Sequence, residues 1–262
     1  MYKFRARAAS FLLAGCGHIL LVAPLSVALA QDSTSSTPDD PEARQCMTKM
    51  AAVYKAMKSY SGSVVVSGQL SGQPNKPSVK SMTKAVVSLQ RPHLAAMYFT
   101  HGSDRNLAVY NGANLFATSS RRKNQYVKQP TSQGLGIMRV LTRAGMTGPG
   151  LGVLFNHPDM LEAFASPASL SLGKPTSVAG IPVVTVISKT QQGQNKMTLT
   201  YHIGKDDYLL RRMILVQTIS GQMVTMTETH TNIKINPELP ASTVTFKPPP
   251  GAKPVRVFIP PL

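Results

Sequence analysis

The sequence predicts an α+β fold, in which one large antiparallel sheet carries helices on one of its faces. The apolar spacing changes from the helical period to the strand period near residue 60. Short alternating segments then recur between turn residues, which favours antiparallel pairing. Two helical segments interrupt them in the middle of the chain. The order is therefore helix, strands, helices, strands, with about eleven strands and about three helices.

The first helix is predicted over residues 42–59, where apolar side chains recur at positions i, i+3, i+4 and i+7. Asp39 or Asp40 can cap its amino end, and Pro41 suits the first turn. Cys46 lies on the apolar stripe and is interpreted as a buried structural thiol. The stripe consists of Ala43, Cys46, Met47, Met50, Val53, Tyr54 and Met57.

The rest of the chain follows the strand period of two, apart from two helical segments. Asn111-Gly112 is a hairpin signal between two strands. Residues 132–144 and 158–164 are predicted as helices, the second opened by Pro158. The predicted strands are residues 63–70, 84–90, 94–100, 107–110, 115–118, 170–177, 182–189, 196–203, 208–218, 222–233 and 243–247.

Residues 1–30 have the pattern of a secretory signal peptide, with a basic start, an apolar run and an Ala28-Leu29-Ala30 cleavage signal. Two alternatives remain: cleavage before Cys16 with lipidation of that cysteine, and an uncleaved anchor. Cleavage after Ala30 is favoured, because the earlier cut leaves a short apolar core and an apolar stub over residues 19–30. Residues 31–41 are expected to form a disordered linker, residues 42–256 one domain and residues 257–262 a flexible tail.

The charged residues indicate binding rather than catalysis. The chain has 28 Lys and Arg against 11 Asp and Glu, a formal net charge of +17 at pH 7. Its histidines occur singly, without the spacing of a metal site, and no glycine-rich phosphate loop follows a strand. We therefore expect no catalytic residue, no metal, no cofactor and no nucleic-acid partner. A polyanion binder, whose affinity would fall steeply with salt, remains an alternative.

The chain is rich in methionine, with 13 residues, and has no tryptophan. Methionine fits irregular apolar shapes, so these side chains either fill a core or line a cavity that accepts acyl chains of differing length. Arg121-Arg122-Lys123 and Arg211-Arg212 are suited to anionic headgroups or a membrane surface, or are solvated strand ends. The methionines expected to face inward are Met47, Met50, Met57, Met82, Met97, Met138, Met160, Met197, Met213, Met223 and Met226.

Four stretches over about residues 42–255 resemble a known family. They are MKSYSG at residues 57–62, LQRPHL at 89–94, VYNGANLF at 109–116 and TVTFKPPPGA at 243–252. The chain resembles the LolA-like proteins, periplasmic carriers of outer-membrane lipoproteins, and is most similar to the predicted periplasmic proteins of the DUF2092 type. The resemblance implies a curved antiparallel sheet, an incomplete barrel of about eleven strands, with helices as a lid over a hydrophobic cavity. The stretch at residues 243–252 would be the closing strand.

The resemblance also implies a site. Arg91 takes the place of the arginine that hydrogen-bonds the lid backbone and holds the empty cavity shut; alternatively it only satisfies loop carbonyls. The carriers favour an aromatic residue beside this turn and a tryptophan in the hairpin, where this chain has Ala95 and Phe116. The expected function is a monomeric periplasmic carrier of lipid or lipoprotein acyl chains, and the alternative is an envelope sensor that binds a protein partner. The candidate lining residues are Leu94, Met97, Phe99, Leu115, Ile137, Val140 and Leu141.

Overall fold

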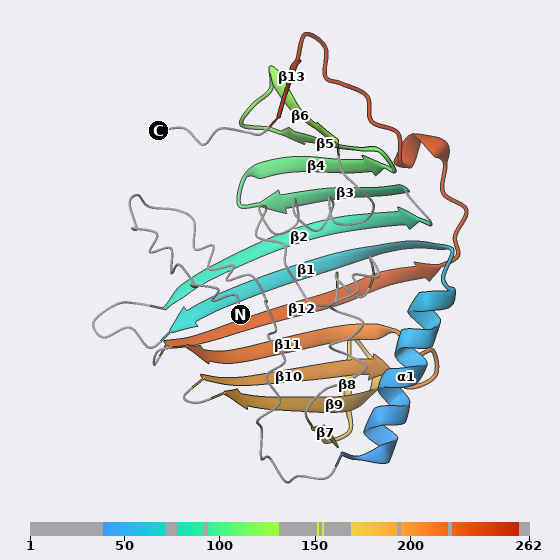
Figure 1. The fold of residues 1–262 in the computed structure, drawn as a ribbon, viewed down its shortest axis with the longest axis vertical. Coiled ribbons are helices and arrows are strands. Elements are labelled where there is room, and N and C mark those ends of the chain that lie inside the picture. Colours follow the sequence, from blue (N-terminus) through green and yellow to red (C-terminus); the bar gives the residue numbers. More distant parts are fainter. Residues whose placement is uncertain are drawn as a thin grey trace, which may run out of the picture.

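The computed structural model describes residues 39–71, 78–91, 94–130, 151, 154, 169–192, 195–219 and 222–256. These residues form one α-helix, one 3₁₀ helix and a sheet of thirteen strands (Figure 1). The signal peptide, the linker up to residue 38, the predicted helices at 132–144 and 158–164 and the tail at 257–262 lie outside the described residues. In the part that is described, no helix is long and apolar enough to cross a membrane.

Helix α1 (Pro41–Ala56) begins where the capping residues predict. The Asp40 carboxylate accepts hydrogen bonds from the backbone N–H groups of Glu42 (2.9 Å) and Ala43 (3.2 Å), which satisfies two of the free donors of the first turn. Asp39 and Asp40 also hydrogen-bond the backbone of Leu170, at 2.9 and 3.0 Å. Asp39, Asp40 and Pro41, assigned to the linker from the sequence, thus belong to the folded domain.

The sheet is open and almost entirely antiparallel, so the predicted α+β class with a curved, unclosed sheet is confirmed. Its order is β13-β6-β5-β4-β3-β2-β1-β12-β11-β10-β9-β7, with β8 beside β9. Strands β1 and β12 pair in the middle and join the two halves. The strands are β1 (Ser59–Ser71), β2 (Val79–Gln90), β3 (Leu94–His101), β4 (Asp104–Asn111), β5 (Asn114–Ser119), β6 (Gln125–Pro130), β7 (Leu170–Leu172), β8 (Thr176–Val178), β9 (Ile181–Gln192), β10 (Asn195–Gly204), β11 (Leu210–Ile219), β12 (Gln222–Ile235) and β13 (Lys253–Val255).

The carboxyl end departs from the prediction. Residues 243–247 do not form a strand: the 3₁₀ helix η1 (Ala241–Thr243) is followed by an irregular segment without ladder pairing. Pro240 before it and three consecutive prolines at 248–250 cannot donate to a ladder. The last strand is instead β13, which pairs in parallel with β6. Strand β6 was not predicted, because its sequence is polar. The predicted strand at 170–177 is two strands, β7 and β8.

The sheet has two unequal faces. The inner face is the one that α1 covers, and it carries the main core cluster, which includes Tyr60, Met97 and Ile203. The helix contacts β7 and β9 and crosses the lower half of the sheet in Figure 1. The outer face carries a small cluster of Ala96, Val109 and Val244, under the segment that follows β12. The inner face therefore carries the main core, in which α1 packs on the sheet.

Candidate functional site

The inner face is built by the alternation of strand side chains. In β3, Met97 and Phe99 point into the main core cluster, and Leu115 from β5 joins them. Leu94 lies on the outer face instead, packed against the Ala96, Val109 and Val244 cluster. The structure thus brings three of the seven candidate lining residues together. Ile137, Val140 and Leu141 lie outside the described residues.

Methionines contribute to this face from both layers. Met50 of α1 and Met213 of β11 are fully buried in the main cluster, and Met226 packs against it. Met82 and Met223 contradict the prediction that they face inward, because they are 52% and 44% exposed. Leu151 and Leu154, the two described residues of the segment 131–168, are fully buried in the same cluster. Apolar side chains from α1, from the sheet and from Leu151 and Leu154 thus form one cluster on this face.

Arg91 connects the sheet with the elements above the inner face. Its Nη1 donates to the carbonyl oxygen of Lys55 (3.2 Å), at the end of α1. Its Nη2 donates to the carbonyl oxygen of Leu154 (3.3 Å), and its backbone N–H donates to Lys58 (2.8 Å). Burial lowers the pKa of Arg91, but a guanidinium remains charged at any physiological pH. One charged fork thus holds two backbone carbonyls from separate segments.

A buried polar relay lies among the apolar side chains of the inner face. His230 Nε2 is 2.7 Å from Glu228 Oε1, and His230 Nδ1 is 3.3 Å from the Tyr60 hydroxyl. Glu228 is 0% and His230 2% exposed. Desolvation by burial raises the pKa of Tyr60, so its hydroxyl stays protonated and can donate. The relay joins β1 to β12 at the centre of the sheet.

The Tyr60 ring reaches His230 because residue 62 is a glycine. A Cβ atom at Gly62 would lie 2.5 Å from the Tyr60 hydroxyl oxygen and 2.8 Å from Cζ. Real Cβ contacts are longer than this, and the fully buried ring has little space to move. The glycine in the SYSG stretch is thus required by a close approach between side chain and backbone.

Gly62→Ala is expected to lower the free energy of unfolding by about 1–3 kcal/mol, through overpacking and loss of the Tyr60–His230 contact. Gly68→Ala, on the same strand, is the control, since its Cβ would meet a single atom, Ser81 Oγ, at 3.0 Å. Urea unfolding of both variants measures the difference. Equal losses would show that the Tyr60 contact is not the cause.

A second polar group lies under α1. The Tyr54 hydroxyl accepts a hydrogen bond from the backbone N–H of Leu210 (3.2 Å). Arg211 is 8% exposed and forms an ion pair with Asp207, which corrects the prediction that Arg211 belongs to a basic surface. Among the described residues, no group of three or more His, Cys, Asp or Glu could hold a metal ion. The inner face offers apolar contact with a few fixed polar groups.

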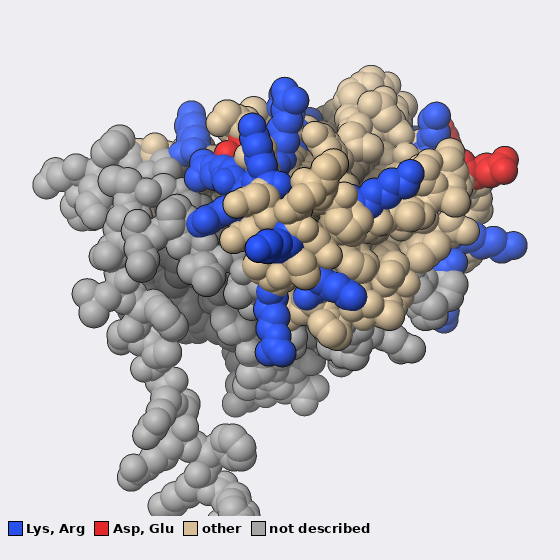
Figure 2. All heavy atoms as spheres, turned by 90° about the horizontal axis from the view of Figure 1, so that it is seen from above, with Lys and Arg blue, Asp and Glu red and all other residues tan. Residues whose placement is uncertain are grey.

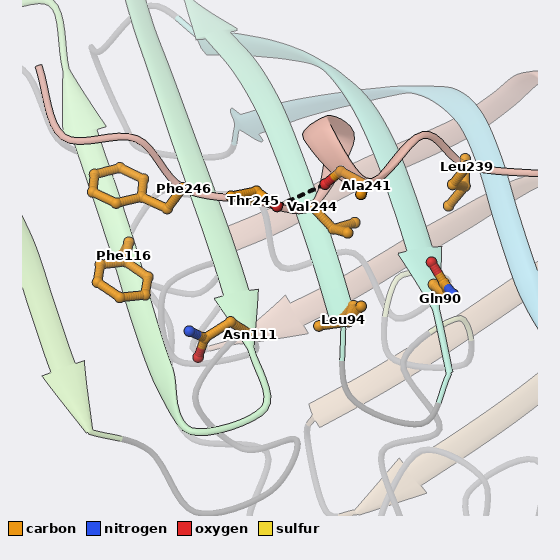
Figure 3. Close-up of a pocket in the computed structure, with 9 residues that line it drawn as sticks. All are labelled: Gln90, Leu94, Asn111, Phe116, Leu239, Ala241, Val244, Thr245 and Phe246. Carbon is orange, nitrogen blue, oxygen red and sulfur yellow. Dashed lines mark hydrogen bonds between the residues drawn. The ribbon is translucent and has the colours of Figure 1, made fainter.

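The outer face has a groove of about 430 Å³ beneath the segment that follows β12 (Figure 3). The Phe116 and Phe246 rings are stacked in it, with centroids 4.7 Å apart. Thr245 Oγ1 donates to the carbonyl oxygen of Ala241 (2.7 Å) and fixes the segment. This groove lies on the opposite side of the sheet from Met97. The lining residues are Gln90, Leu94, Asn111, Phe116, Leu239, Ala241, Val244, Thr245 and Phe246.

A family described as predicted periplasmic protein, DUF2092, matches residues 43–258. The chain belongs to the DUF2092 family. The match spans α1, the whole sheet and the final strand, so the resemblance found in the sequence is confirmed at the level of this family. No curated protein matches this DUF2092 chain.

Solved structures to which the chain is similar include two mycobacterial proteins, the first of which is described as a lipoprotein. LppX of Mycobacterium tuberculosis is 14% identical with a TM-score of 0.44, over 77% of this chain and 99% of its own. LprF of Mycobacterium bovis is 14% identical with a TM-score of 0.41, over 83% and 100%. A LolA superfamily protein of Nitrosomonas europaea is 10% identical with a TM-score of 0.32, over 78% and 97%.

The sequence reading of this DUF2092 chain missed the buried relay. Glu228 and His230 stand two residues apart, a spacing that places both on one face of a strand. They alternate with Thr227, Thr229 and Thr231, so polarity alone does not tell which set faces inward. The pairing of β12 with β1 decides it, because Val64 pairs with His230 and Val66 with Glu228.

Proposed function

We propose that this protein is an exported carrier that holds lipid or lipoprotein acyl chains between the inner face of its sheet and its helices. The observation that supports it most is the bridge made by Arg91 over an apolar, methionine-containing face. Each methylene taken from water contributes roughly 0.8 kcal/mol, so a sixteen-carbon chain gains on the order of 10 kcal/mol. Part of that gain offsets the free-energy cost of moving the helices away from the sheet. No bond is made or broken in such a transfer.

The route and compartment belong to the same proposal. The DUF2092 family is described as predicted periplasmic. The signal pattern at residues 1–30 agrees with export, with cleavage after Ala30. The mature protein then starts at Gln31 and carries lipid as cargo rather than as its own anchor.

Native mass spectrometry of the purified full chain, together with binding of a fluorescent fatty acid, tests the proposal. We expect bound lipid in the spectrum, or a saturable change in probe fluorescence that persists at high salt. A chain that remains free of lipid and binds no probe would exclude the carrier function.

Met97→Ala is expected to weaken binding of the fluorescent fatty acid several-fold, because it removes apolar surface from the inner face. Tyr98→Ala is the matched control: it is the next residue of β3, but its side chain lies on the outer face and is 49% exposed. Circular dichroism checks that both variants are folded. Equal effects on affinity would place the acyl chain elsewhere.

The outer groove supports a second candidate, a sensor that binds a protein segment. It is lined by stacked aromatic rings and by polar amides, Gln90 and Asn111, which suits an extended peptide. A stable protein partner that is lost on Phe246→Ala, with no lipid bound, would favour this function over the carrier.

A further inference from the structure

Six basic side chains gather at one end of the β13 edge of the sheet: Arg105, Arg121, Arg122, Lys123, Lys253 and Arg256, here called the basic corner. Arg121, Arg122 and Lys123 form the turn between β5 and β6. Arg105 adjoins this turn, since it exchanges hydrogen bonds with Ser120 of 2.8 and 3.0 Å. Lys253 adjoins it from the other side, because its backbone N–H donates to Asn124 (3.0 Å) and it pairs with Gln125.

In the part of the chain that the structure describes, the residues around this corner are mostly basic. Asp104 forms an ion pair with Arg121 (2.6 Å). Residues 105–130 and 239–256 contain no Asp or Glu at all. Figure 2 views the molecule from this side and shows many Lys and Arg side chains with few acidic ones. Lys123, Lys253 and Arg256 are exposed to solvent. The positive electrostatic potential of such a cluster attracts an extended anionic surface.

The basic corner fits an extended anionic surface. In the compartment to which the proposed function assigns the protein, the surface of this kind that a carrier of acyl chains meets is the phospholipid membrane. Each Lys or Arg close to anionic headgroups strengthens the attachment.

We propose that the basic corner docks the protein on the surface of an anionic phospholipid membrane. This deepens the proposed function, on which it rests, because a carrier of acyl chains has to meet the membrane that supplies or receives them. Docking at the β13 edge leaves α1, which packs at the β7 end of the sheet, away from the contact.

Co-sedimentation with vesicles tests the proposal. The full chain is expected to bind vesicles of equal parts phosphatidylglycerol and phosphatidylcholine, and to bind pure phosphatidylcholine vesicles much more weakly. Binding should fall with added salt. Lys123→Ser/Lys253→Ser/Arg256→Ser should lower the partition coefficient on the order of 100-fold, since each Lys or Arg near an anionic surface contributes roughly fivefold.

Lys174→Ser/Lys189→Ser/Lys196→Ser is the matched control, as it removes three exposed lysines around β9 and β10 in the other half of the sheet. It should lower binding far less. An equal loss in the control, or equal binding to both kinds of vesicle, would overturn the proposal.

Binding of the fluorescent fatty acid separates docking from the carrier function. The basic-corner variant should bind the probe as the unaltered chain does. Vesicle docking without any probe binding would reject the carrier function alone, and probe binding without docking would reject the membrane surface alone.

Discussion

His230→Leu is expected to lower the free energy of unfolding by about 3–5 kcal/mol. The substitution removes the imidazole that lies 2.7 Å from the Glu228 carboxylate and 3.3 Å from the Tyr60 hydroxyl. A buried polar group that loses its partner keeps the full cost of its desolvation. Urea unfolding followed by circular dichroism measures the loss.

The double variant Glu228→Leu/His230→Leu separates the pair from the packing around it. Replacing both members of a buried pair with apolar side chains is often neutral, so the double variant should recover most of the stability that the single variant loses. His101→Leu, at an exposed histidine on β3 of the same sheet, should have a much smaller effect. If the single and double variants are equally unstable, the relay is not the cause.

Arg91→Ala is expected to lower the free energy of unfolding by about 2 kcal/mol and, at the same time, to raise the affinity for a fluorescent fatty acid about tenfold. The variant loses two charge-assisted hydrogen bonds, to Lys55 and Leu154, that hold the elements above the inner face. If these bonds favour the closed, empty state, their removal makes the open state more populated and strengthens binding. Fluorescence titration and urea unfolding measure the two effects.

Two controls distinguish a gate from a structural arginine. Val109→Ala removes a buried side chain of the outer cluster and should cost about 1–2 kcal/mol without changing probe affinity. Arg91→Lys keeps the charge but not the fork that reaches two carbonyls, so it should fall between the parent and Arg91→Ala. A loss of stability with unchanged affinity would assign Arg91 the structural role alone.

The architecture could be predicted because strand alternation and turns are local signals. Met97 and Phe99, two of the candidate lining residues, lie on the inner face, two positions apart as the strand period requires. The prediction that Leu94 lines the same face was wrong. Leu94 is an odd number of positions from Met97 in one strand, so its side chain has to face the other way. A strict parity check on β3 would have excluded it.

Features that depend on contacts distant in sequence could not be predicted. Arg211 and Arg212 were treated as one basic pair, but neighbouring strand residues point to opposite faces, and a register shift beside β10 leaves Arg211 with Asp207. The alternation in Thr243-Val244-Thr245-Phe246 predicted a strand. In the structure, this segment lies over the outer face without pairing with a strand. Val244 packs in the outer cluster, and Phe246 stacks on Phe116.

Strand β13 also protects one edge of the open sheet from pairing with other chains. An unpaired edge presents free N–H and C=O groups to any other chain, and neighbouring molecules can assemble edge to edge. The parallel pairing of Lys253–Val255 with Gln125–Val127 occupies that edge on β6, and Pro254 lacks a donor of its own. A shortened chain that ended before Lys253 would expose β6, and oligomers or fibres built through that strand would be the consequence.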